Sequence, residues 1–135
     1  MRLVIVNASR PNEIETAFAE LVQQHADALQ VSSDGFLLTY PDQIVALAAH
    51  YAVPAIYAWP KFAAVGGLIS YGTNLSDAWR QAGIYTGRIL KGERLADLPV
   101  QQVTTIDLAI NLNTAKALGI TVPLPLSGRA DEVIE

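Results

Sequence analysis

The fold is decided by the stretch from Val53 to Gly72, which reads VPAIYAWPKFAAVGGLISYG. Residues 53–57 are mostly apolar and predict a strand, and residues 61–65 predict a short helix. Gly66 and Gly67 end that helix, and residues 68–71 predict the next strand. Two strands that flank a helix with short turns form a βαβ unit, which places both strands in a parallel sheet.

The residues before this stretch follow the same alternation. The run Leu-Val-Ile-Val at residues 3–6 has no polar alternation, as expected for a strand covered on both faces. Apolar residues recur at helical spacing from Glu13 onward, and residues 28–32 predict a second strand. Pro41 is suited to the first turn of a helix that runs to about His50.

The residues after this stretch change character. Asn74 or Ser76 can cap a helix in which we expect Trp79 to pack into the core. Residues 103–110 predict a strand and residues 114–118 a short helix, and a final helical turn is expected near the C-terminus. The overall expectation is an α/β fold, a three-layer sandwich with a parallel sheet between helices.

Composition excludes several classes of protein. The 135 residues fit one domain, and 51% are hydrophobic while 16% are charged, which argues against disorder. A formal net charge of -4 argues against nucleic-acid binding, which needs a basic face. Cysteine is absent, so disulfides and thiolate chemistry are excluded. No apolar run approaches the roughly 18 residues of a membrane span, and we expect no export signal in the chain as given.

The candidate ligand site lies at the carboxyl ends of the predicted strands, where open parallel sheets bind ligands. Hydroxyls, amides, one carboxylate and aromatic rings gather there and suit a small polar or aromatic ligand. The alternative is that they are ordinary turn residues, as the Asp-Gly pair at Asp34 suggests. Trp59 is either a stacking wall or an exposed interface residue. The candidate binding residues are Asn7, Ser33, Asp34, Tyr57, Ser70, Tyr71 and Gly72.

Enzyme motifs are absent from the sequence. His25 and His50 lie near predicted helix ends, and neither belongs to an HExxH pair. The nucleophile elbow and the phosphate-binding loop are also missing. We therefore expect no catalytic residue, no metal and no cofactor.

The second half of the chain resembles a bacterial family of ABC transporter substrate-binding proteins with a periplasmic-binding-protein type I fold. The resemblance begins with Gly-Gly-Leu-x-Ser-Tyr-Gly at residues 66–72, and the first half also looks similar at residues 26–29 and 54–57, so that the resemblance covers nearly the whole chain. Further matching segments are Ile-Leu-Lys-Gly at 89–92, Asp-Leu-Pro-Val at 97–100, Ile-Asn-Leu at 110–112, Thr-Ala-Lys-Ala-Leu-Gly at 114–119 and Ala-Asp-Glu-Val-Ile at 130–134.

This resemblance implies a small organic solute, such as an amino acid, held between two lobes that close around it. It implies delivery to the membrane subunits of an importer and a periplasmic or extracytoplasmic location, whereas a truncated form without a signal would be cytoplasmic. The positions carried over from the family are Ser33-Asp34 and the segment Ser70-Tyr71-Gly72.

Relatives in this family are longer, so the resemblance implies that residues 1–135 form one partial domain, mainly the C-terminal lobe, with 93–135 as a return and tail segment. The chain is expected to begin at the second strand of that lobe, which leaves strand edges unpaired and predicts a homo-oligomer through such an edge. Two alternatives remain open. One is a self-associating structural module without a ligand, and the other is a small flavodoxin-like enzyme.

Overall fold

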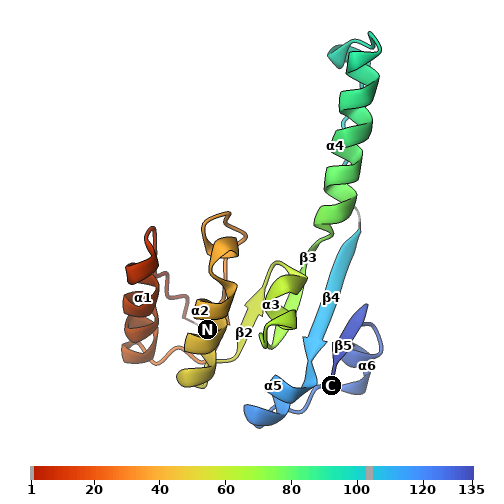
Figure 1. Ribbon diagram of the computed structural model, residues 1–135. Helices are drawn as coiled ribbons and strands as arrows, with labels where there is room; N and C mark the ends of the chain where they lie inside the picture. Colours follow the sequence, from red (N-terminus) through yellow and green to blue (C-terminus); the bar gives the residue numbers. More distant parts are fainter. Residues whose placement is uncertain (1, 103–104) are drawn as a thin grey trace.

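The computed structural model describes residues 2–102 and 105–135 and contains one five-stranded sheet in the order β1-β2-β3-β4-β5 (Figure 1). Strands β1, β2 and β3 are parallel, β4 is antiparallel to β3, and β5 is parallel to β4. The strands are β1 (Leu29–Gln30), β2 (Ala55–Tyr57), β3 (Ile69–Thr73), β4 (Ile106–Asn111) and β5 (Glu132–Ile134).

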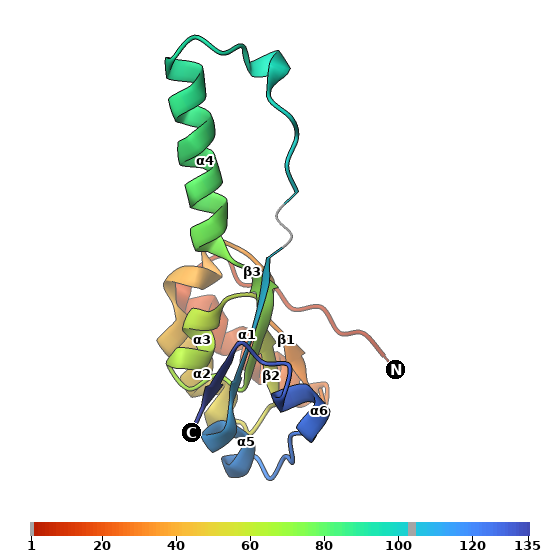
Figure 2. The same cartoon turned by 90° about the vertical axis from the view of Figure 1, so that its right-hand side faces the viewer.

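Helices α2 and α3 lie on one side of this sheet and α6 on the other (Figure 2), which confirms the α/β class. Proline stands in the first turn of α1, α2 and α3, where its missing N–H leaves no helical hydrogen bond unmade. The helices are α1 (Pro11–Gln23), α2 (Pro41–His50), α3 (Pro60–Ala64), α4 (Leu75–Leu90), α5 (Leu112–Ala117) and α6 (Leu124–Ser127), with 3₁₀ turns η1 (Leu37–Thr39) and η2 (Leu95–Asp97).

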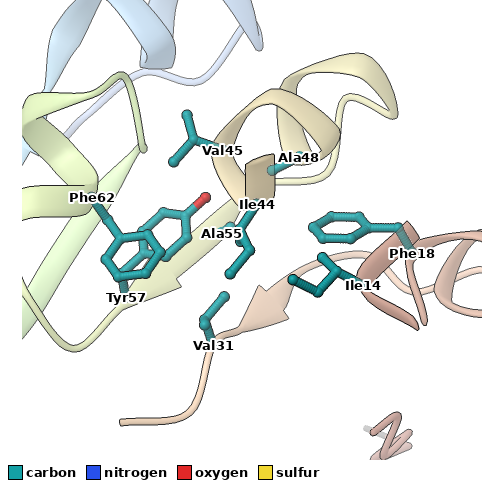
Figure 3. Close-up of a cluster of buried hydrophobic side chains, with 9 residues drawn as sticks. All are labelled: Ile14, Phe18, Val31, Ile44, Val45, Ala48, Ala55, Tyr57 and Phe62. Atoms are coloured by element: carbon teal, nitrogen blue, oxygen red, sulfur yellow. The ribbon is translucent and has the colours of Figure 1, made fainter. Parts of the chain in front are cut away.

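The main hydrophobic core lies between β1, β2 and helices α1 to α3 (Figure 3). The rings of Tyr57 and Phe62 stack at its end, with centroids 4.6 Å apart. Gly67 has to be glycine here, because a Cβ on it would lie 2.6 Å from the Tyr57 ring. The core side chains in Figure 3 are Ile14, Phe18, Val31, Ile44, Val45, Ala48, Ala55, Tyr57 and Phe62.

A polar clamp fastens β4 and α5 to the end of α3. The Asn111 side chain, 5% exposed, donates from Nδ2 to the carbonyl oxygen of Ala63 at 3.2 Å and accepts from the Thr114 N–H at 3.1 Å. The Thr114 hydroxyl donates to the Gly66 carbonyl oxygen at 2.7 Å. The clamp thereby gives the Gly66 carbonyl a partner, adds a second donor to the Ala63 carbonyl, which also accepts from the Gly66 N–H, and satisfies one free N–H of α5.

Replacement of Asn111 by Ala should lower the free energy of unfolding by about 1–2 kcal/mol, since it removes a helix cap and one of the two hydrogen bonds to the buried Ala63 carbonyl oxygen. Urea unfolding followed by circular dichroism measures this change. Asn113→Ala, two positions further along and exposed on α5, is the control and should cost less than about 0.5 kcal/mol. Equal losses in the two variants would contradict the clamp.

Several sequence predictions are wrong in detail. Residues 3–6 form no strand, and Leu3 and Ile5 are 78% and 72% exposed, because no other described residue pairs with them. The C-terminal segment predicted as a helical turn is the strand β5, which gains its ladder from β4. Part of the strand predicted over 103–110 lies outside the described residues, and the observed β4 starts at Ile106.

Helix α4 projects from the rest of the molecule (Figure 1). Trp79 on this helix is 74% exposed, so its predicted place in the core is wrong. None of the α4 residues is buried in the described part of the chain. The apolar residues of α4 do recur at helical spacing, as predicted. Residues 2–102 and 105–135 provide no surface against which they pack.

Candidate functional site

A cleft of about 310 Å³ lies where β2 and β3 end and β4 begins. This volume is at the lower end of the range for small-molecule sites. The cleft lies at the carboxyl ends of parallel strands, the edge that the sequence analysis selected. Its lining residues are Leu38, Trp59, Pro60, Lys61, Asn74, Leu75, Ser76 and Asp107.

Asn74 and Asp107 form the polar centre of the cleft. Asn74 Nδ2 donates to Asp107 Oδ2 at 2.8 Å, and Asn74 Oδ1 accepts from the Asp77 N–H at 2.9 Å, which caps α4. The backbone N–H of Asn74 also donates to the carbonyl oxygen of Thr105 at 3.1 Å. Both ends of the Asn74 amide are thus bonded, which holds the amide and, through it, one oxygen of the Asp107 carboxylate in place.

The remaining walls of the cleft differ in chemistry. Trp59 supplies an aromatic ring that is half-buried, and Lys61 supplies an exposed cation at the start of α3. Nearby, hydrogen bonds from Thr105 and then Arg80 lower the pKa of Asp77, so its carboxylate stays ionised beside the first turn of α4. The cleft therefore combines an aromatic surface, a carboxylate and a cation.

The seven residues predicted from the sequence do not line this cleft, and their role in binding stays a prediction. Asn7, Ser33 and Asp34 are exposed in loops, and Asp34 Oδ1 accepts from the Phe36 N–H at 2.8 Å, as in an Asx turn. Tyr71, 56% exposed, points to the opposite face of β3 from Ser70.

The other predicted residues lie inside the fold. Tyr57 and Ser70 face the core from neighbouring positions of β2 and β3. Gly72 lies against the residue that follows β2, and a Cβ on it would overlap the carbonyl oxygen of Ala58. Gly72 thus allows the close approach that brings the end of β3 beside Trp59.

The sequence analysis missed Lys61, Asn74 and Asp107 as cleft residues. Asn74 was noted only as a helix cap, although it follows a strand directly. Asp107 could not be found from the alternation of strands and helices, because it enters on β4, which is antiparallel to β3. Trp59 was left between a stacking wall and an interface residue, and it lies in the wall of the cleft.

Substitutions at Ser70 and Gly72 separate a packing role from a binding role. Ser70 Oγ is buried and has no hydrogen-bond partner among the described residues. We expect Ser70→Ala to leave stability unchanged or to raise it by up to about 1 kcal/mol. Gly72→Ala should lower it by about 2 kcal/mol or more through overpacking. Thermal melts measure both, and a large loss in Ser70→Ala would show that the hydroxyl has a partner.

Burial raises the pKa of Tyr57 to about 12. An unfolded tyrosine ionises near pH 10, so the unfolded chain binds fewer protons than the folded one between about pH 10 and pH 12. Stability should be unaffected below about pH 9 and should fall above pH 10, by up to about 1.4 kcal/mol per pH unit. Urea unfolding of the wild type and of Tyr57→Phe measures this, and the wild type should lose stability relative to the variant above about pH 10. Parallel curves would contradict the assignment.

None of the helices in the described ranges is long and apolar enough to cross a membrane. A mostly parallel sheet with a cleft at its carboxyl edge places the chain in the α/β class, in which such edges commonly bind small molecules. Residues 1–134 match the family of ABC transporter substrate-binding proteins, and the chain belongs to this family. No functionally curated protein matches the sequence.

Solved structures agree with this assignment. A conserved domain protein from Vibrio cholerae superposes with a TM-score of 0.86 at 23% identity, over 95% of this chain and 43% of that one. The ABC domain of a Streptococcus pneumoniae protein in complex with L-Trp gives 0.82 at 28% identity, over 91% and 41%. A ligand-free, open substrate-binding protein with adhesive properties from Clostridium difficile gives 0.65 at 25% identity, over 98% and 43%. The chain thus spans less than half the length of each.

Proposed function

We propose that this chain is one lobe of a solute-binding protein and that its cleft binds an amino acid with an aromatic side chain, without chemical turnover. The observation that carries the proposal is the composition of the cleft, in which Trp59, Lys61 and Asp107 lie together. The L-Trp held by the Streptococcus pneumoniae protein supports the same class of ligand.

The chemistry of each wall matches one part of such a ligand. The Asp107 carboxylate accepts from the α-ammonium group, with Asn74 holding that carboxylate in place at 2.8 Å. The Lys61 ammonium pairs with the α-carboxylate. The Trp59 ring offers an apolar face to the aromatic side chain of the ligand. A neutral solute would leave two charged groups of the cleft without partners.

We further propose that the lobe acts by capture and delivery to the membrane subunits of an importer on the extracytoplasmic side of the membrane. Membership in the family of ABC transporter substrate-binding proteins supports this role. An opposing lobe would complete the binding site, since relatives with this fold carry more than half of their length outside the matched region. The affinity of this chain alone should therefore be weak.

A second candidate function is a structural module that associates through a strand edge. Strand β1 is the outer strand of the sheet, and the N–H groups of Leu29 and Val31 point to β2, so the N–H of Gln30 points outward. A free edge of this kind can pair with another chain. Gln30→Pro removes the outward N–H without touching the β2 ladder, and it should abolish any association through this edge.

Ligand analogues test the amino-acid proposal by calorimetry. L-Trp should bind the wild type more tightly than tryptamine, which lacks the carboxylate, or indole-3-propionate, which lacks the ammonium group. Lys61→Met should remove the preference for L-Trp over tryptamine, and Asp107→Asn the preference over indole-3-propionate, each by about tenfold or more. Each variant is thus matched to the analogue that lacks its partner.

The control for lost charge is Lys116→Met on α5, which lies outside the cleft and should bind like the wild type. Bound ligand should also raise the melting temperature, because it binds the folded chain and not the unfolded one. No heat of binding and no thermal shift with L-Trp at millimolar concentration would overturn the proposal and favour the structural module.

A further inference from the structure

Leu38 lines the cleft from the 3₁₀ turn η1 and takes no part in the ligand contacts proposed above. Its side chain is half-buried, so part of it packs against the core and part of it faces the cleft. Trp59, which follows β2, is half-buried against the same core and lines the same cleft. Two segments that are distant in the sequence thus supply apolar surface for the side chain of a ligand.

Three hydrogen bonds hold η1 in one conformation. Asp34 Oδ1 accepts from the Phe36 N–H at 2.8 Å, and the Asp34 carbonyl oxygen accepts from the Leu38 N–H at 3.1 Å. The Thr39 hydroxyl donates to the Phe36 carbonyl oxygen at 2.6 Å. Two of these bonds end on Asp34, so the residue that opens the turn also fixes the backbone at Leu38.

The turn is also anchored to the core and to α2. The rings of Phe36 and Tyr40 lie 5.1 Å apart, and both pack against the core together with Leu37. The Tyr40 N–H donates to the Leu37 carbonyl oxygen at 3.1 Å, and the Tyr40 carbonyl oxygen accepts from the Ile44 N–H in the first turn of α2. The segment that presents Leu38 to the cleft is therefore fixed at both of its ends.

We propose that Leu38 determines which aromatic side chains the cleft accepts, and that Asp34 is the positioning residue that holds Leu38 in place. This role rests on the proposed function, because it concerns the same cleft. A wall that is fixed by hydrogen bonds and by packing does not move aside for a larger ligand, so the side chain at position 38 limits the size of the aromatic group. In an apolar pocket, one methylene more or less changes the discrimination between ligands by about 10- to 200-fold.

This geometry gives Asp34 a role other than contact with the ligand. Asp34 is not among the residues that line the cleft, and one of its carboxylate oxygens accepts from the Phe36 N–H. A carboxylate that pairs with a ligand cation needs its charge, whereas an Asx turn needs only an acceptor oxygen, which Asn also has. The two roles therefore predict different results for Asp34→Asn.

Titration calorimetry with L-Trp, L-Phe and 4-phenyl-L-phenylalanine tests the role of Leu38. Leu38→Phe narrows the cleft and should lower the affinity for L-Trp, relative to L-Phe, by about tenfold or more. Leu38→Ala widens the cleft and should raise the affinity for 4-phenyl-L-phenylalanine, relative to L-Trp, by a similar factor. Ratios of affinities are compared because an unfolded fraction of a variant lowers the affinity for each ligand equally.

Leu37→Ala is the matched control for these variants. Leu37 precedes Leu38 in the same turn and packs against the core, but it does not line the cleft. This variant should lose stability and keep the affinity ratios of the wild type. Unchanged ratios in both Leu38 variants, or an equal change in Leu37→Ala, would overturn the role of Leu38.

Substitutions at Asp34 test the positioning role with the same ligands. Asp34→Ala removes the acceptor of the Phe36 N–H and loosens the turn, so the ratio of the affinities for 4-phenyl-L-phenylalanine and L-Trp should move toward that of Leu38→Ala. Asp34→Asn keeps an acceptor oxygen and should keep the wild-type ratio. The preference for L-Trp over indole-3-propionate, which reports the contact with the ligand ammonium group, should be unchanged in both variants. An equal effect of Asp34→Asn and Asp34→Ala would overturn the positioning role.

The outcomes separate the role of Leu38 from the proposed function. If the wild type binds none of the three amino acids, the proposed function fails and the role of Leu38 fails with it. If Lys61→Met and Asp107→Asn change the binding of L-Trp and its analogues as proposed while both Leu38 variants leave the ratios unchanged, the binding function stands and only the role of Leu38 fails.

Discussion

The structure depends on one buried amide, that of Asn111. Its Nδ2 donates to the Ala63 carbonyl oxygen and its Oδ1 accepts from the first turn of α5, which fixes β4 relative to α3. That position pairs Asp107 with Gly72 and brings the Asp107 carboxylate to Asn74. Since Asn74 also caps α4, the direction of the projecting helix and the polar centre of the cleft follow from the same constraint.

Helix starts and turns could be predicted from the sequence, because they depend on residues that are neighbours in the chain. Pro41 starts α2 as expected, and the turn at Gly66 and Gly67 separates α3 from β3 as expected. Features that require a distant partner could not be read from the sequence. Residues 3–6 have strand-like composition, but no other described strand pairs with them. Strand β5 has a weak strand signal in its own sequence and forms because it pairs with β4.

The position of the candidate site was predictable from the parallel sheet, but its residues were not. Successive side chains of a strand point to opposite faces of the sheet. At Tyr57 and Ser70 this places the side chains in the core and not at the cleft. Trp59 and Asn74 follow β2 and β3, as the rule for strand ends requires, but the other polar residues of the cleft come from helix starts and from the antiparallel strand β4, which that rule does not include. Trp79 was misplaced for a related reason, since helical periodicity shows that a face is apolar and not what covers it.

The order of the strands in space is their order in the chain, and this has a consequence for biosynthesis. As the ribosome extends the polypeptide, each new strand up to β3 finds its neighbour already made, with short loops to close. The clamp at Asn111 joins residues 48 positions apart and forms after most of the chain has emerged. Folding of this lobe can therefore proceed vectorially, with the cleft assembled once β4 has joined β3.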